Sequence, residues 1–186
     1  MIKKFTVLIL FSIFGFGIFS TYAGDKISKG IRAGWQYSNL YKDGSSLVED
    51  PMSSFYVGIF GYQKLLKSKL LQIGSGLTYY QVGSKKDDDN RIKLHYLNLP
   101  VNVKVQVGPV YGFVGLNGAL KLGGETYILS VKSDVSDFST FDAGAFVGIG
   151  VNVLMLGIEV KYDWGLVDVN NGYKTQYLQA GLTVSF

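Results

Sequence analysis

Few residues of this chain have the types and spacing that catalysis requires. His95 is the only histidine, and a catalytic triad would need its imidazole beside a serine and a carboxylate. His95 instead falls on the apolar face of a segment in which apolar and polar residues alternate. There is no cysteine, which excludes a cysteine nucleophile, a thiolate metal site and a disulfide framework. We therefore predict no catalytic residue and no enzymatic activity.

Two other features bear on ligand binding. Asp87, Asp88 and Asp89 form an oxygen-rich cluster of the kind that calcium prefers, but the glycine and distal glutamate of an EF-hand loop are missing. The Gly-Ser-Gly at 74–76 and the Gly-Ile-Gly at 148–150 lie inside alternating segments and do not precede a helix, as a nucleotide-binding fingerprint would. We expect a solvated loop in the first case and room for packing in the second, with no metal or cofactor.

The beginning of the chain differs in character from the rest. Lys3 and Lys4 give a positive start, an apolar run covers residues 7–19, and the small residues that follow suit a signal-peptidase site. We predict a signal peptide at 1–23 and one domain at 24–186. The alternative, an uncleaved anchor, is disfavoured because the run is short for a spanning helix. The net charge of +4 falls to about +2 without the two lysines, so nucleic acid is not an expected partner.

Alternation of apolar and polar residues predicts the fold. It persists from His95 to Val107, about thirteen residues, whereas soluble strands usually span about five or six and a tilted transmembrane strand about nine to eleven. The same criterion places strands near 28–40, 53–64, 69–83, 92–107, 109–122, 139–153, 155–167 and 175–186. Long links at 41–52, 85–91 and 123–138 alternate with shorter ones. We predict an all-β fold, an eight-stranded antiparallel up-and-down transmembrane β-barrel.

The two faces of these strands differ in composition. In residues 155–167, for example, Ile158, Val160 and Tyr162 share one face, while the opposite faces of the strands are polar and rich in glycine. An eight-stranded lumen has room only for side chains, so we expect the small, polar face inside and the apolar face against lipid. A soluble lipocalin-like barrel would have the reverse arrangement. Residues 53–64 are apolar on both faces and cannot be oriented from the pattern.

Charged residues also occur on the face expected to point inward. They are Arg32, Lys104, Lys121, Asp142, Glu159, Lys161 and Asp163. Charges of both signs in a narrow space of low dielectric constant are tolerated only if they pair and hydrogen-bond. We expect Lys121 and Asp142 near the outer ends of adjacent strands, and Arg32, Lys104 and Glu159 near the inner rim. The predicted result is a structural network that plugs the lumen.

Aromatic residues are expected to mark the membrane boundaries. Those near the long-link ends of the strands are Trp35, Tyr37, Tyr79, Tyr162 and Trp164, and Phe186 ends the chain at the opposite rim. Amphipathic rings favour the headgroup level of a bilayer. The pattern therefore predicts an aromatic girdle on the outward face.

The segment from Leu94 to Val105 resembles a known family. Tyr96, Leu97, Leu99, Pro100 and Lys104 match the pattern of the outer-membrane beta-barrel domain family of Bacteroidetes-type envelopes. Asn98 stands where the family has an acidic residue, so the resemblance carries over no role for a carboxylate at that position. Matches elsewhere extend the resemblance over nearly all of residues 28–186.

The resemblance implies a small, porin-like integral protein of the outer membrane, and one branch of the family, the PorT-like proteins, is associated with protein secretion. The final segment of this chain resembles the carboxy-terminal sorting signal of outer-membrane proteins, with Phe186 as the closing aromatic. The partners it implies are outer-membrane lipid and lipopolysaccharide, the barrel-assembly machinery, and surface or secretion proteins.

Three functional hypotheses follow from these observations. The first is a non-enzymatic structural or surface-interaction protein whose long links contact partners while its lumen is plugged. The second is a narrow porin-like channel or small-molecule transporter, with an accessory role in secretion as a variant suggested by the family. The third is a soluble lipocalin-like binder, which the volume argument disfavours.

Overall fold

The computed structural model places most of the chain in one sheet. The described residues are 28–42, 45–46, 50–65, 70–87, 90–128, 131–134, 139–168 and 172–186. The predicted signal peptide at 1–23 lies outside them. Within these ranges there is no helix long and apolar enough to cross a membrane.

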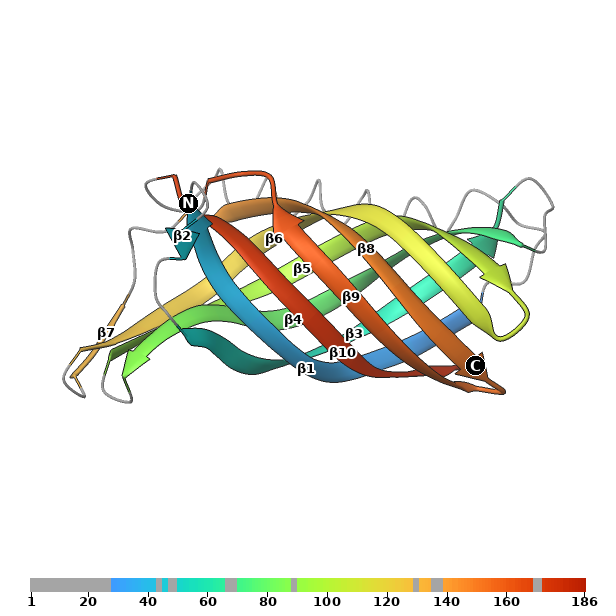
Figure 1. Ribbon diagram of the computed structural model, residues 1–186, viewed down its shortest axis with the longest axis horizontal. Coiled ribbons are helices and arrows are strands. Elements are labelled where there is room, and N and C mark those ends of the chain that lie inside the picture. The colour runs from blue at the N-terminus through green and yellow to red at the C-terminus, as the bar shows by residue number, and fades with distance from the viewer. Residues whose placement is uncertain are drawn as a thin grey trace.

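Eight long antiparallel strands form a closed barrel, as the alternation predicts (Figure 1). They are β1 (Ser28–Lys42), β3 (Asp50–Lys64), β4 (Leu71–Asp87), β5 (Asn90–Val107), β6 (Val110–Ile128), β8 (Phe141–Val153), β9 (Leu156–Gly165) and β10 (Lys174–Ser185). Each strand pairs with its neighbours in the chain, and β10 returns to pair with β1 from Gly30 opposite Ser185 to Tyr41 opposite Lys174. Closure leaves neither of these two strands with an unpaired edge.

The two ends of the barrel differ. At one end, which we call the short-turn end, residues 108–109 join β5 to β6 and residues 154–155 join β8 to β9. The chain terminus Phe186 lies there, hydrogen-bonded to Lys29 through both backbone groups. Figure 1 shows this end at the right and the opposite, extended end at the left, where β7 and the β4–β5 hairpin project.

The predicted long links are in large part strand. Residues 123–138 contain the end of β6 and a short strand, β7 (Val131–Asp134), which pairs back onto β6. Within 85–91, Lys85 pairs with Arg91, and within 41–52 the strand β2 (Ser45–Ser46) pairs with β1. The polarity of these segments suggests loops, but backbone pairing continues because exposed hairpins can be polar on both faces, and residues such as Tyr127 and Ile128 favour strands.

Exposure along the strands confirms the predicted faces. On β9 the side chains of Glu159, Lys161 and Asp163 are buried, whereas Ile158 and Val160 are 63% and 41% exposed. A soluble barrel would bury the second set and expose the first. An apolar exterior of this extent requires lipid around it, which excludes the lipocalin-like arrangement.

The strand that the pattern left unoriented is resolved by its register. On β3, Phe55, Val57 and Ile59 point outward and are about half exposed, while Tyr56 and Phe60 are buried in the interior. Phe60 pairs with a glycine, Gly30 of β1, and its ring occupies the space that a Cβ there would take. The interior is therefore not only small and polar, because glycines on one strand make room for aromatic rings on the next.

The face assignment predicts a position-dependent cost for an outward charge. Val160 lies near the middle of the apolar wall of β9, so Val160→Arg is expected to reduce the free energy of unfolding by about 2–4 kcal/mol. Val167→Arg, beyond the end of β9 at the extended end, should cost about 0–1 kcal/mol. Urea unfolding in vesicles, followed by tryptophan fluorescence, measures both; equal costs at the two sites would contradict the lipid-facing assignment of Val160.

Candidate functional site: the interior of the barrel

A cluster of mostly aromatic side chains lies in the half of the interior toward the extended end. This outer cluster consists of Tyr56, Tyr80, Val82, Leu94, Tyr96, Ala119 and Tyr177, each no more than 2% exposed. The ring centroid of Tyr80 lies 5.6 Å from that of Tyr96 and 5.1 Å from that of Tyr177. Side chains from five strands, β3, β4, β5, β6 and β10, thus meet in the interior, and the contact of Tyr80 with Tyr177 joins strands that are not neighbours.

A second aromatic group, the inner cluster, lies toward the short-turn end. It consists of Tyr111 and Phe113 from β6 and Phe146 from β8. Phe113 pairs with Gly148, where a Cβ would overlap its ring, and Tyr111 pairs with Gly150 in the same way. The outer ends of the β6 rings lie over the glycines of β8, where a larger residue would leave no room for them.

An ion pair lies beside the inner cluster. Arg32 of β1 contacts Glu159 of β9 at 3.2 Å, with both side chains less than 10% exposed, and the Tyr111 hydroxyl donates to the other Glu159 oxygen at 3.3 Å. The Arg32 guanidinium also lies over the Phe60 ring, 4.8 Å from its centroid. Both charges therefore have partners that partly replace the water they lose on burial.

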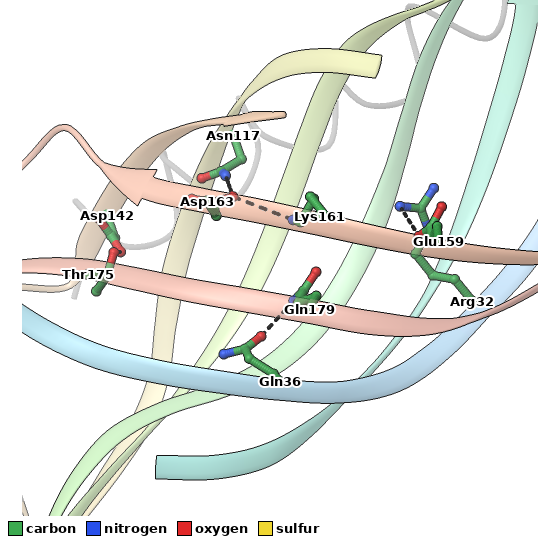
Figure 2. Close-up of polar contacts among 9 residues, drawn as sticks. All are labelled: Arg32, Gln36, Asn117, Asp142, Glu159, Lys161, Asp163, Thr175 and Gln179. Carbon is green, nitrogen blue, oxygen red and sulfur yellow. Dashed lines mark hydrogen bonds and ion pairs between the residues drawn. The ribbon is translucent and has the colours of Figure 1, made fainter. Parts of the chain in front are cut away.

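A second polar group lies further along β9 (Figure 2). Lys161 contacts Asp163 at 3.4 Å, and the same carboxylate accepts a hydrogen bond from the side-chain amide of Asn117 on β6. Asn117 and Asp163 are on strands separated by β8, whose Gly144 lies between them; a Cβ there would come within 2.6 Å of Asp163 Oδ1. A glycine in the intervening strand is what lets these side chains meet.

The remaining members of the predicted network have different surroundings. Asp142 accepts a hydrogen bond of 2.8 Å from Thr175, again across an intervening strand. The Lys104 ammonium lies over aromatic rings, 3.6 Å from the Tyr62 centroid and 5.2 Å from that of Tyr111. Lys121 is half buried on β6 opposite Tyr96. Together the charged residues lie along the interior and do not converge on one point.

The positions that carry the family resemblance lie on both faces of β5. Tyr96, Pro100 and Lys104 are buried inside, whereas Leu97 and Leu99 belong to the outer wall. A bulge between His95 and Tyr96 shifts the pairing of β5 with β6. The motif thus combines interior packing with lipid-facing apolar contact and contains no reactive group.

His95 lies on the outer wall, away from the interior charges. Its Nδ1 is 2.6 Å from the hydroxyl of Tyr79, which also accepts a hydrogen bond from Gln81 at 3.2 Å. Two further outward aromatics, Tyr162 and Trp164 of β9, have ring centroids 5.8 Å apart. Among the residues that the structure describes, no group of three or more histidines or carboxylates could hold a metal ion.

The sequence comparison agrees with the geometry. A family model for the outer membrane protein beta-barrel domain matches residues 22–171. The chain belongs to this family. Membership agrees with the apolar exterior and the closed sheet. It also supports a location in an outer membrane. A search of curated protein sequences gives no match.

Solved structures with the same architecture are remote in sequence. Neisserial surface protein A is 16% identical with a TM-score of 0.59, covering 87% of this chain and 100% of that one. The attachment invasion locus protein Ail of Yersinia pestis is 13% identical with a TM-score of 0.56, covering 87% of this chain and 99% of that one. At such identities the likeness establishes the fold of this family member and nothing about its ligands.

The interior aromatics are the residues that the sequence analysis missed. Phe60, Phe113 and Phe146 lie on the face expected to be polar and small, so the alternation pattern alone assigns them ambiguously. The available signal was their pairing with glycines, since Phe60 faces Gly30 and Phe113 faces Gly148. That signal requires knowledge of the register between strands, which a single strand does not carry.

The ion pair beside the inner cluster predicts a non-additive effect on stability. Glu159→Gln leaves the Arg32 guanidinium buried without its counter-charge and is expected to reduce the free energy of unfolding by about 3–5 kcal/mol. The double variant Arg32→Met with Glu159→Gln removes the unpaired charge and should recover most of this loss. Urea titration in vesicles measures both variants; additive losses would contradict a direct pairing of Arg32 with Glu159.

Proposed function

We propose that this family member is a non-enzymatic surface-interaction protein whose plugged barrel anchors the hairpins at its extended end. The single observation that supports the proposal is the packing of two aromatic clusters in the interior, with the Arg32–Glu159 ion pair beside the inner one. Arg32 pairs with Glu159 and Lys161 with Asp163, and such pairs are better suited to stabilising the barrel than to acting as a nucleophile or general base. On this view Arg32, Lys104, Lys121, Asp142, Glu159, Lys161 and Asp163 have structural roles.

The proposed orientation places the extended end outside the cell and the short-turn end in the periplasm. Short periplasmic turns and longer external segments are the usual arrangement of such barrels. Phe186 then lies at the periplasmic end, where the barrel-assembly machinery can reach the terminal segment as a sorting signal. The chain would enter this route through a cleaved signal peptide at residues 1–23.

The proposed partners are molecules that approach the extended end. Outer-membrane lipid and lipopolysaccharide surround the aromatic residues of the outer wall, such as Trp35, which is 66% exposed. The projecting hairpins would contact surface proteins or glycans. Ail, which shares the fold, is an attachment invasion locus protein with a structure in complex with a heparin analogue, sucrose octasulfate. A role beside a secretion system, which the family resemblance implies for the PorT-like branch of Bacteroidetes-type bacteria, is a variant of this proposal.

A narrow channel is the second candidate. The observation that favours it is the row of alternating charges along β9, in which Glu159, Lys161 and Asp163 all point into the barrel. Such a row could guide ions if the aromatic clusters moved aside. The two candidates differ in whether the lumen conducts.

Planar-bilayer recording of the purified protein separates these candidates. We expect no steady conductance for the native chain, and none for Lys161→Gln or Asp163→Asn, because on this proposal the two aromatic clusters plug the lumen. Each variant is first checked for folding by its mobility on a detergent gel with and without boiling. Steady, ion-selective openings that change in either variant would replace the plugged barrel with the channel.

Protease treatment of intact cells tests the orientation and the exposure of the hairpins. Cleavage is expected within 41–52, 85–91 or 123–138, because these segments join strands at the proposed outer end. The turns at 108–109 and 154–155 should remain intact until the outer membrane is permeabilised. Cleavage at these turns in intact cells would mean that the barrel is inserted the other way round.

A further inference from the structure

Two turns at the short-turn end are apolar where polar residues are usual. In the β8–β9 turn, Leu154 is 97% exposed and Met155 is 64% exposed. In the β5–β6 turn, Gly108 and Pro109 are flanked by Val107 and Val110, which are 65% and 53% exposed. The turns are adjacent, since the Asn152 amide donates to the Pro109 carbonyl at 2.7 Å. They form one continuous apolar tip.

The backbone conformation at Leu154 is one that leucine rarely adopts. Its φ of 57° lies in the left-handed region, and no other described residue except glycine has a positive φ. Tight turns in water fill such positions with glycine, asparagine or aspartate, which adopt this conformation at little cost. A leucine there is unfavourable for the backbone and also exposes a large apolar side chain to any surrounding water.

The apolar tip continues the lipid-facing wall without a break. Val151 and Val153 lead into the turn on β8, and Leu156 and Ile158 leave it on β9, all more than 40% exposed. About ten residues separate Leu154 from the outward aromatic Trp164, which corresponds to about 25 Å along the axis at a rise of about 3.3 Å and a tilt of about 40°. That is the height of a complete apolar band. The turn therefore falls at the boundary of the hydrocarbon region and not below it.

The charges around this rim fit a phospholipid surface. Lys29 at the start of β1 and Lys64 at the end of β3 are exposed there. Among the described residues of the rim, no exposed aspartate or glutamate accompanies them. Amines at this level can reach lipid phosphates while their methylene chains lie along the apolar wall.

We propose that the β8–β9 turn, with the β5–β6 turn beside it, is seated in the bilayer leaflet at the short-turn end. Leu154 and Met155 contact acyl chains near the headgroups, and Lys29 and Lys64 contact phosphates. The turns are then membrane contacts and not periplasmic loops. This inference does not depend on the proposed surface function or on which end faces the cell exterior, since in symmetric vesicles either leaflet offers the same lipid.

The absence of cysteine allows a direct test. Leu154→Cys carries a polarity-sensitive nitrobenzoxadiazole label, and Asp168→Cys, exposed near the extended end, is the matched control. Both proteins are reconstituted in vesicles of phosphatidylethanolamine and phosphatidylglycerol. The label at 154 is expected to emit further to the blue than the control, to be quenched by lipids brominated near the headgroup, and to be shielded from iodide. The control label should show the opposite pattern.

Several outcomes would overturn the proposal. One is a label at 154 as accessible to iodide as the label at 168. Another is shielding that occurs only in native membranes and disappears in vesicles of the purified protein, which would identify a protein partner. Oxidative cross-linking of Leu154→Cys at low protein density would identify a second copy. If Leu154→Cys does not fold, Met155→Cys provides the same measurement one residue further along the turn.

Discussion

The pairing of β1 with β10 is the interaction on which the rest of the molecule depends. Lipid offers no hydrogen-bond partner to a backbone amide or carbonyl, so an open sheet edge cannot exist in the hydrocarbon region. The register from Gly30 opposite Ser185 to Tyr41 opposite Lys174 closes the sheet along almost the whole length of β1. Once the sheet is closed with eight strands, the interior is narrow, and every inward side chain must share that small volume.

This restricted volume explains the composition of the interior. Large rings fit where the adjacent strand has a glycine, as Phe113 fits against Gly148. Polar groups on non-adjacent strands meet where a glycine lies between them, as Asn117 and Asp163 meet across Gly144. Burial of charge is offset by these contacts and by the rings beneath the cations, as with Arg32 over Phe60. The glycines are therefore part of the packing of the core.

The sequence predicts the wall of the barrel better than its contents. The alternation of apolar and polar residues assigns Val160 to lipid and Lys161 to the interior. In a closed barrel each side chain points either outward to lipid or inward to the lumen. Alternation does not orient the segment of Tyr56 and Phe60, because aromatic residues suit both faces and the deciding factor is Gly30 on another strand. The sequence also predicts loops where the hairpin strands continue, because polar composition indicates a loop but does not prevent backbone pairing.

Side-chain contacts between strands that are not neighbours also affect the stiffness of the barrel. A closed sheet held only by neighbouring ladders can flatten into an ellipse, because bending it alters few hydrogen bonds. Contacts between strands that are two apart, such as Asp142 with Thr175 and Arg32 with Glu159, connect parts of the wall that share no backbone hydrogen bonds. They therefore resist this deformation. The cross-section should therefore stay round under the lateral pressure of the bilayer, which holds the projecting hairpins at fixed distances from one another.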